Sequence, residues 1–426
     1  MVMDHTTPSG WIDRWAAADF DRPALAFDDG IVSYGQLATE VEARARSLKR
    51  DVDVGQVTPV FVGPDLPSIV DLFAHIAVGA VPMPRSTSRP KVDGQRADGA
   101  VVCLATSGSS GASRLVPLTM ANLTAAVEAS RARLGTGSDD RWLACLPLTH
   151  IGGLSVLFRS FESGGAAVVG PFGHSTPSLI ERMRPSVASF VPTMVHRLVE
   201  ADPGAIASIG LVLVGGASLS TSLLERARAV GVKLVPTYGM TETSSQVATR
   251  SPAEPPGTEP GSVGQPLDGF AVSVASTAVG GAGRITVDGP AVFSGYVGED
   301  ERTGPFITND IGVVAPDGSL TVLGRADDVV ITGGENVSLP SVQDVLSGIA
   351  EIHDVVVVGV GDDEWGTAVC ALVVAPSLEA AQEGAVEVLA AHEVPKRWAT
   401  TDRIPLLPNG KVDSEAVRAR FEAQAS

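Results

Sequence analysis

The stretch LATSGSSGASRLVPLTMAN, residues 104–122, is the part of the sequence around which the rest can be interpreted. An apolar run at 101–105 precedes it and predicts a strand, and a helix is expected from about Thr119. Glycines let the backbone turn back and approach a ligand closely, while exposed N–H groups and hydroxyls can surround an anion. The stretch is therefore typical of a loop that binds nucleotide phosphates, with a plain Gly/Ser loop as the alternative. It is not a Walker A loop, because the pattern G-x-x-x-x-G-K-S/T does not occur in it.

The segment TSGSSGASRLV resembles the signature loop of the adenylate-forming superfamily, which comprises acyl- and aryl-CoA ligases, luciferases and peptide-synthetase adenylation domains. The superfamily pattern is roughly S/T-S-G-S/T-T-G-x-P-K-x-V, and here Ser113 replaces the proline and Arg114 the lysine. Arginine keeps the charge but changes its geometry. Because only five of the 31 basic residues are lysine, we interpret Arg114 as a neutral replacement that lysine could substitute. The resemblance implies phosphate contacts from Thr106, Ser107, Gly108, Ser109, Ser110, Gly111 and Arg114.

Composition and charge restrict the class of protein. A chain of 426 residues suits one large and one smaller domain. A net charge of −18 argues against nucleic-acid binding and against an anionic membrane surface as partners. The three cysteines lack metal-ligand spacing and predict buried thiols in a reducing compartment. No apolar run approaches a bilayer-spanning length, and residues 1–10 lack a signal-like apolar core. We therefore expect a cytoplasmic protein without membrane insertion, as a monomer or a homo-oligomer.

The order of predicted elements indicates an α/β protein. A helix at 11–18, a hairpin at 24–34, a strand at 57–62 and a helix at 67–78 alternate as in a domain with a parallel sheet. The polar, proline-rich residues 82–98 are expected to form a loop. A β-rich section follows the Pro/Gly-rich connector at 252–264, and the last hundred residues alternate β and α. We predict a large N-terminal domain with α/β sheets and a β-rich subdomain, followed by a small mobile C-terminal α+β domain.

Two further blocks contain candidate site residues. His150 lies in a turn before the apolar helix expected at 154–161, and Arg159 is a cation inside that helix. Without the resemblance, His150 would be interpreted as a turn or core histidine. A cation such as Arg159 either extends to solvent or pairs with an acid. The resemblance instead implies that His150 lines the acyl pocket near the phosphates. After the strand expected at 211–214, it implies adenine contacts from Gly215, Gly216 and Ala217.

The motif YGMTET, residues 238–243, matches the superfamily residue for residue. Tyr238 can stack on a purine, Gly239 permits a turn, and Met240 adjoins the nucleotide. Thr241 can bond phosphate oxygens, and Glu242 offers a hard oxygen ligand to Mg²⁺. A polar loop after a strand is the alternative explanation.

The C-terminal motifs complete the resemblance. It implies that Asp310 and Arg325 contact the ribose, that Asp327 is the hinge, and that Lys411 in PNGKVD is the catalytic lysine. The predicted domains are therefore residues 1–325 and 328–426, with the hinge at 325–328. An exposed lysine near the end of a chain would otherwise be only solvated.

The superfamily's chemistry implies a two-step ligase that uses ATP, Mg²⁺ and coenzyme A. A carboxylate attacks the α-phosphorus of ATP, and a thiol then attacks the acyl-adenylate. The narrower resemblance is to the o-succinylbenzoate–CoA ligases of menaquinone biosynthesis, through LPLTHIGGLSVLFRS, residues 212–246 and the compact length. It implies substrate contacts from His150, Arg159, Gly239, Ser245 and Gln246, with Arg159 beside the second carboxylate. Another aryl- or acyl-CoA ligase, an adenylation enzyme that loads a carrier protein, and a nucleotide-binding pseudoenzyme remain as alternatives.

Overall fold

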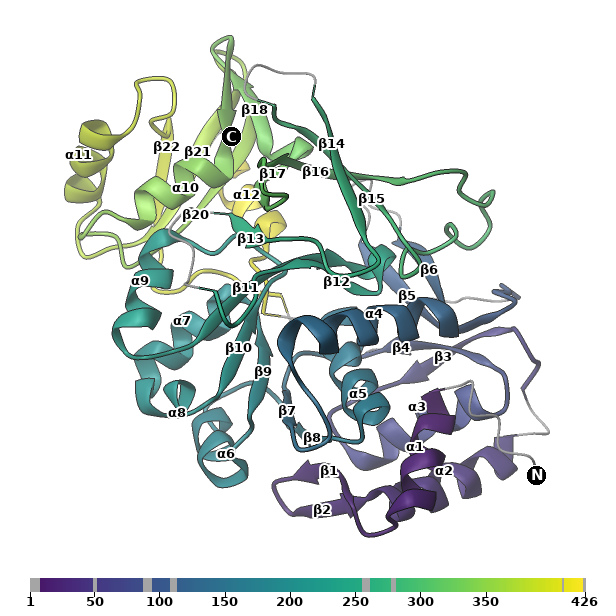
Figure 1. Ribbon diagram of the computed structural model, residues 1–426. Coiled ribbons are helices and arrows are strands. Elements are labelled where there is room, and N and C mark those ends of the chain that lie inside the picture. Colours follow the sequence, from purple (N-terminus) through teal and green to yellow (C-terminus); the bar gives the residue numbers. More distant parts are fainter. Residues whose placement is uncertain are drawn as a thin grey trace.

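The computed structural model describes residues 8–48, 52–86, 94–107, 113–254, 261–276, 281–407 and 410–423. The large domain, the β-rich sheet and the C-terminal region follow one another along the chain (Figure 1). Within these described residues, no helix is both long enough and apolar enough to cross a bilayer.

The centre of the large domain is a mostly parallel sheet of eight strands among the described residues. Its spatial order is β12-β11-β10-β9-β7-β8-β1-β2, with antiparallel pairing only at the two edges. The inner strands β8 and β9 are buried along their whole length, as expected for a parallel sheet that is covered on both faces. The strands are β1 (Pro23–Phe27), β2 (Gly30–Ser33), β7 (Arg141–Ala144), β8 (Ala166–Val169), β9 (Val187–Phe190), β10 (Leu211–Val214), β11 (Leu234–Met240) and β12 (Ser245–Thr249).

Helices cover both faces of this sheet and so create two hydrophobic cores (Figure 1). On one face Phe73 and Phe161 pack edge to face with ring centroids 5.1 Å apart. The opposite face includes Phe190 and Leu198. The first group is α1 (Pro8–Ala18), α2 (Tyr34–Leu48), α3 (Leu66–Ala77), α4 (Met120–Leu134) and α5 (Ile151–Ser163). The second group is α6 (Thr176–Met183), α7 (Pro192–Ala201), α8 (Pro203–Ala207) and α9 (Thr221–Ala229).

Two short pairs of strands flank this sheet. The prediction of a loop over 82–98 is wrong at its start, because β4 (Val81–Arg85) pairs in parallel with β3 (Val57–Phe61). Each strand of a two-stranded pair has one unpaired edge, and prolines can place their missing N–H there. The phosphate-loop stretch forms an antiparallel hairpin of β5 (Ala100–Ser107) and β6 (Ser113–Thr119). The helix expected from about Thr119 is α4, which begins at Met120 with Thr119 as its N-cap.

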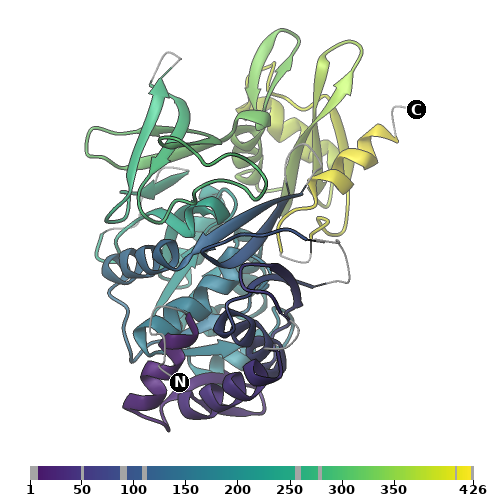
Figure 2. The same ribbon diagram turned by 90° about the vertical axis from the view of Figure 1, so that its right-hand side faces the viewer.

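Two further sheets confirm the predicted fold class. The β-rich part is an antiparallel sheet in the order β13-β17-β16-β15-β14, and the C-terminal region has its own sheet covered by helices on both faces (Figure 2). The first contains β13 (Ser262–Gly264), β14 (Ala271–Ser276), β15 (Gly283–Asp288), β16 (Phe306–Val314) and β17 (Leu320–Arg325). The second contains β18 (Val329–Thr332), β19 (Glu335–Ser338), β20 (Asp354–Asp362), β21 (Gly366–Val374) and β22 (Arg397–Thr400), with α10 (Leu339–Ser347), α11 (Leu378–Val388) and α12 (Ser414–Glu422). A short 3₁₀ turn, Ala326–Asp328, joins the two sheets. Rotation about Asp327 stays a prediction.

Candidate active site

Lys411 lies at the end of the central sheet although it comes from the last part of the chain. The Thr193 hydroxyl, at the start of α7, donates a 2.5 Å hydrogen bond to the carbonyl of Gly410. A Cβ added to Gly216, just beyond β10, would lie 3.2 Å from Cε of Lys411. Gly216 has a φ of +81°, which favours glycine. The structure therefore brings Lys411 to the predicted adenine segment.

Four predicted site residues share one electrostatic neighbourhood. Desolvation and the charge of Arg325 lower the pKa of Lys411, while Asp310 acts in the opposite direction. Part of His150 is exposed to solvent, and partial desolvation together with the charge of Lys411 lowers its pKa. His150 is consequently neutral near pH 7 and adds no positive charge to the site.

The predicted ribose-binding pair sits on two neighbouring strands. Asp310 of β16 and Arg325 of β17 are register partners, and Arg325 Nη1 lies 3.8 Å from Asp310 Oδ1. Tyr238 donates its hydroxyl to the other carboxylate oxygen of Asp310 at 2.6 Å. Tyr238 therefore orients Asp310, a contact that the sequence did not indicate. Its stacking on a purine stays a prediction.

The YGMTET segment makes a tight and strained turn. A Cβ on Gly239 would lie 1.7 Å from the carbonyl oxygen of Ser245, so only glycine fits. Ser244 and Ser245 have φ of +56° and +108°, conformations that side chains rarely adopt. The turn carries the 3₁₀ segment Thr241–Thr243, which contains the predicted site residues Thr241 and Glu242. Strain in consecutive residues is often found where a site must be held in shape.

Glu242 has the surroundings expected of a ligand for a substrate-bound cation. Tyr296 donates to Glu242 Oε1 at 2.9 Å, and Oε2 accepts no hydrogen bond from the described residues. No cluster of three or more metal-ligating side chains occurs in the described part of the chain. Mg²⁺ commonly binds through one or two carboxylates together with substrate phosphates. Glu242 therefore fits Mg²⁺ that arrives with ATP, and its role as a metal ligand stays a prediction.

Arg114 makes contacts that the motif did not indicate. Its Nε and Nη2 donate to both carboxylate oxygens of Glu299 at 2.8–3.1 Å, and Cζ lies 3.4 Å from the centroid of the Tyr296 ring. The paired contact to both carboxylate oxygens uses the planar edge of the guanidinium, a geometry that an ammonium group does not reproduce. That lysine would serve equally well in function stays a prediction. Thr106 donates to the carbonyl of Arg114 across the hairpin. Gly108, Ser109, Ser110 and Gly111 lie outside the described residues, and Ser107 ends β5.

Arg159 is a buried cation with neutral neighbours. Its side chain is on α5, the residue is 6% exposed, and Nη2 donates to the hydroxyl of Ser245 at 3.0 Å. Cζ lies 5.3 Å from the ring centroid of Trp142. Within the described ranges no carboxylate pairs with Arg159, and its Nε is buried without a hydrogen-bond partner. Burial lowers its pKa to about 10. Neither expected alternative, exposure to solvent or an internal ion pair, is therefore observed.

Comparisons with known proteins identify the family. Residues 85–297 match the model of the AMP-binding enzyme, and residues 341–411 match that of the AMP-binding enzyme C-terminal domain. The 2-succinylbenzoate–CoA ligase of Bacillus licheniformis is 36% identical over 333 residues, covering 74% of this chain and 69% of the relative. The chain belongs to the AMP-binding enzyme family.

Other AMP-binding enzymes match over almost the whole length. The 2-succinylbenzoate–CoA ligase of Bacillus thuringiensis subsp. konkukian is 29% identical over 99% of this chain and 100% of the relative. The o-succinylbenzoate CoA synthetase of Bacillus subtilis, in complex with its acyl-adenylate intermediate, has a TM-score of 0.82 and 25% identity. That match covers 97% of each chain. The same synthetase is also known in complex with ATP and magnesium ion.

Gln246 has an internal role in this AMP-binding enzyme. Its amide oxygen accepts from the Ser130 hydroxyl at 2.6 Å, and its amide nitrogen donates to Thr249 Oγ1 at 2.8 Å and Thr237 Oγ1 at 3.3 Å. These bonds join α4 to β11 and β12 behind the strained turn. Its predicted contact with substrate stays a prediction.

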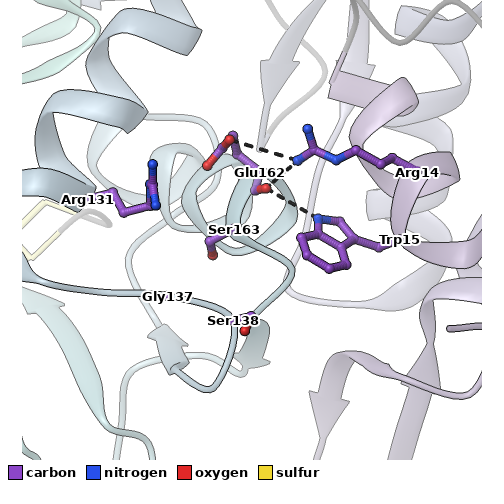
Figure 3. A pocket seen from close by; sticks show the side chains of 7 residues that line it. All are labelled: Arg14, Trp15, Arg131, Gly137, Ser138, Glu162 and Ser163. Atoms are coloured by element: carbon purple, nitrogen blue, oxygen red, sulfur yellow. Dashed lines mark hydrogen bonds and ion pairs between the residues drawn. The ribbon is translucent and has the colours of Figure 1, made fainter. Parts of the chain in front are cut away.

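A separate cavity of about 370 Å³ lies at the far end of α5, beside α1 and α4. Figure 3 shows Glu162 between Arg14 and Arg131, with Trp15 closing one side. None of the residues that line the cavity belongs to the predicted site.

The residues that sequence reasoning missed at the site are Trp142, Thr193, Tyr296 and Glu299. Only Tyr296, in the sequence Gly295-Tyr296, had a local signal, and it indicated a turn.

Proposed function

We propose that this AMP-binding enzyme is an o-succinylbenzoate–CoA ligase that uses MgATP and coenzyme A. The succinyl carboxylate attacks the α-phosphorus of ATP, the bond to pyrophosphate breaks, and an acyl-adenylate forms. The sulfur of CoA then attacks the acyl carbonyl, and AMP leaves. Relatives that carry this name, together with the residues gathered at the end of the central sheet, support the proposal.

The first step brings an anionic acid to an anionic nucleotide, so its main barrier is electrostatic. Lys411 can neutralise the charge that builds at the α-phosphate, because it reaches the same region as Gly216 and Arg325. Thr241 can donate to a phosphate oxygen. Glu242 would hold Mg²⁺, which would supply positive charge to offset that of the phosphates. Asp310 and Arg325 would hold the ribose and thereby fix the α-phosphate relative to the acid.

The burial of Arg159 without a carboxylate partner among the described residues is the main support for the substrate assignment. o-Succinylbenzoate has a ring carboxylate besides the carboxylate that reacts. A buried guanidinium with no carboxylate partner among the described residues suits that second anion. Ser245, which bonds Arg159, packs against Gly239 in the YGMTET turn, so one residue links the proposed anchor to the segment proposed to face the phosphates. A charge-assisted contact of this kind contributes about 1.5–3 kcal/mol.

The second step requires access for the thiol after the adenylate has formed. We propose that the C-terminal region then turns about Asp327, which withdraws Lys411 and opens the site. The 3₁₀ turn Ala326–Asp328 is a short connection between two sheets and supports this position for the hinge.

The test is a screen for thioester formation with ATP, Mg²⁺ and CoA. The acids are o-succinylbenzoate, its analogue without the ring carboxylate, benzoate and straight-chain fatty acids, with the CoA-thioester and AMP quantified by chromatography. We expect o-succinylbenzoate to give the highest kcat/KM, at least about tenfold above the analogue. Preference for another acid would leave a CoA ligase of different specificity. Adenylate formation without CoA-thioester would instead favour an enzyme that loads a carrier protein.

A further inference from the structure

The guanidinium of Arg114 is held on two sides. Glu299 accepts from the edge formed by Nε and Nη2, and the ring of Tyr296 lies against one face. Within the described residues, no hydrogen bond is formed by Nη1. A planar cation can offer one edge to an acid, one face to a ring and the remaining edge to a third group in one fixed geometry, which a rotating ammonium group does not provide.

Tyr296 also contacts the predicted metal ligand. Its hydroxyl donates to Glu242 Oε1 at 2.9 Å. Burial and the charge of Glu242 raise the pKa of Tyr296, so the phenol remains a donor at neutral pH. One side chain thus touches both the phosphate-loop cation and the carboxylate assigned to Mg²⁺.

The segment that carries Tyr296 and Glu299 is anchored without any contribution from a nucleotide. Phe293 is 1% exposed and packs edge to face on Tyr296 and on Phe306, with centroids 4.8 and 5.2 Å away. Its N–H donates to the carbonyl of Glu242. The N–H of Val297 donates to the carbonyl of Leu115 in β6. The segment therefore connects the hairpin of the phosphate loop to the YGMTET turn.

We propose that Tyr296 and Glu299 are positioning residues that hold Arg114 and Glu242 in a fixed relation for MgATP. This inference rests on the proposed function because it assumes that the nucleotide is ATP and the metal is Mg²⁺. It does not depend on which carboxylic acid is the substrate. The phosphates of MgATP must meet a cation and a metal ligand at one separation, and Tyr296 sets that separation in advance. Since the side chains of Arg114 and Glu299 are 43% and 51% exposed, their ion pair adds little to stability. The ion pair instead holds the guanidinium of Arg114 in one orientation.

Calorimetric titration with MgATP, in the absence of any carboxylic acid, tests the proposal independently of the acyl substrate. Glu299→Gln should raise the Kd for MgATP about tenfold, because Arg114 loses its orienting contact. Asp300→Asn is the matched control, because this exposed acid is on the same segment and forms no ion pair with Arg114. Tyr296→Phe keeps the ring under Arg114 but removes the hydroxyl that donates to Glu242. It should therefore raise the Mg²⁺ concentration for half-maximal ATP binding about fivefold. At saturating Mg²⁺ its Kd should change less than about twofold.

A double-mutant cycle distinguishes positioning from a general structural effect. In an Arg114→Ala background, Glu299→Gln should have no further effect on the Kd, because the cation through which it acts has gone. The proposal is overturned if Glu299→Gln binds MgATP as Asp300→Asn does, if the two substitutions at 114 and 299 are additive, or if Tyr296→Phe leaves the Mg²⁺ dependence unchanged. If these shifts are observed while o-succinylbenzoate is not activated, the acid assignment fails and the positioning role stands.

Discussion

The side chain of Lys411 lies against the backbone of Gly216, where a Cβ would be 3.2 Å from its Cε and 3.6 Å from its Nζ. Gly216 follows β10 of the central sheet, and Lys411 belongs to the C-terminal region. Ligands of open α/β sheets bind beyond the carboxyl ends of the strands. The observed arrangement of the two regions therefore supports the proposed role of Lys411 at the phosphates.

Lys411→Ala should abolish adenylate formation and spare the second half-reaction. A lysine on a region that turns can act only while it faces the phosphates. We expect pyrophosphate exchange to fall by about a thousandfold, the scale of one transition-state charge contact. Thioester formation from supplied acyl-adenylate should stay within about twofold of the wild type. Lys396→Ala, in the same region, is the control. Equal loss of both half-reactions would contradict this role.

Gly216→Ala tests the contact between Lys411 and Gly216 by changing the glycine instead of the lysine. A methyl group at this position meets Lys411 and also Val191, whose Cγ1 would be 3.5 Å away. We expect adenylate formation to fall about ten- to a hundredfold, because a displaced catalytic group loses its geometry. Gly231→Ala is the matched control, since its φ is +86° and no atom lies within 4 Å of its added Cβ. Both variants bear the same backbone strain, about 1–2 kcal/mol. Similar rates in the two variants would show that strain alone is responsible.

Asp344 of the C-terminal region contacts α9 of the large domain, and this contact should favour the first half-reaction. Its carboxylate accepts from the N–H of Thr221 at 3.0 Å and from its hydroxyl at 3.4 Å, so it binds the first turn of α9. Asp344→Ala should slow pyrophosphate exchange about fivefold to tenfold, the effect of losing one helix-capping contact. Thioester formation from supplied adenylate should not decrease. Asp363→Ala, an exposed acid of the same region, is the control. Loss of both activities in Asp344→Ala would mean general destabilisation.

The pH dependence of the first step should show the altered titration of Lys411. Its pKa is lowered by desolvation and by Arg325. Because the protonated form is the one that neutralises phosphate charge, activity falls as pH rises through this lowered pKa. Pyrophosphate exchange should therefore decline at a lower pH than an ordinary lysine would give. Lys411→Arg should lose this alkaline decline while keeping reduced activity, since arginine stays charged. An unchanged profile in Lys411→Arg would assign the decline to another group.

The sequence predicted well the features that depend on local pattern. The helix expected from about Thr119 is α4, and the strand predicted at 211–214 is β10. Apolar periodicity, turn residues and capping residues are close together in the chain, so they can be interpreted without knowledge of the fold. The proline-containing strand β4 was missed, because proline usually marks a loop and pairing with β3 cannot be known locally.

The arrangement around Arg114 could not be predicted for a different reason. Its partner Glu299 is distant in the sequence, and an exposed glutamate in a loop has no pattern that distinguishes it from other acids. The same applies to Trp142 beside Arg159. Motifs indicated which residues belong to the site, and only the tertiary structure gives their neighbours. Those neighbours show that Arg114 uses its guanidinium geometry in contacts that the motif did not indicate, whereas its functional interchange with lysine stays a prediction.

The most direct test of the substrate assignment is the ratio of kcat/KM for o-succinylbenzoate to that for its analogue without the ring carboxylate, measured in the wild type and in Arg159→Met. Arg159 is buried and pairs with no carboxylate among the described residues. The wild type should favour o-succinylbenzoate by about tenfold or more, and Arg159→Met should reduce that ratio towards one by raising the KM for the diacid. The KM for ATP should stay nearly unchanged, and Arg131→Met, on the surface of α4, should behave as the wild type. An identical ratio in wild type and Arg159→Met, or a wild type that does not use o-succinylbenzoate, would contradict the assignment.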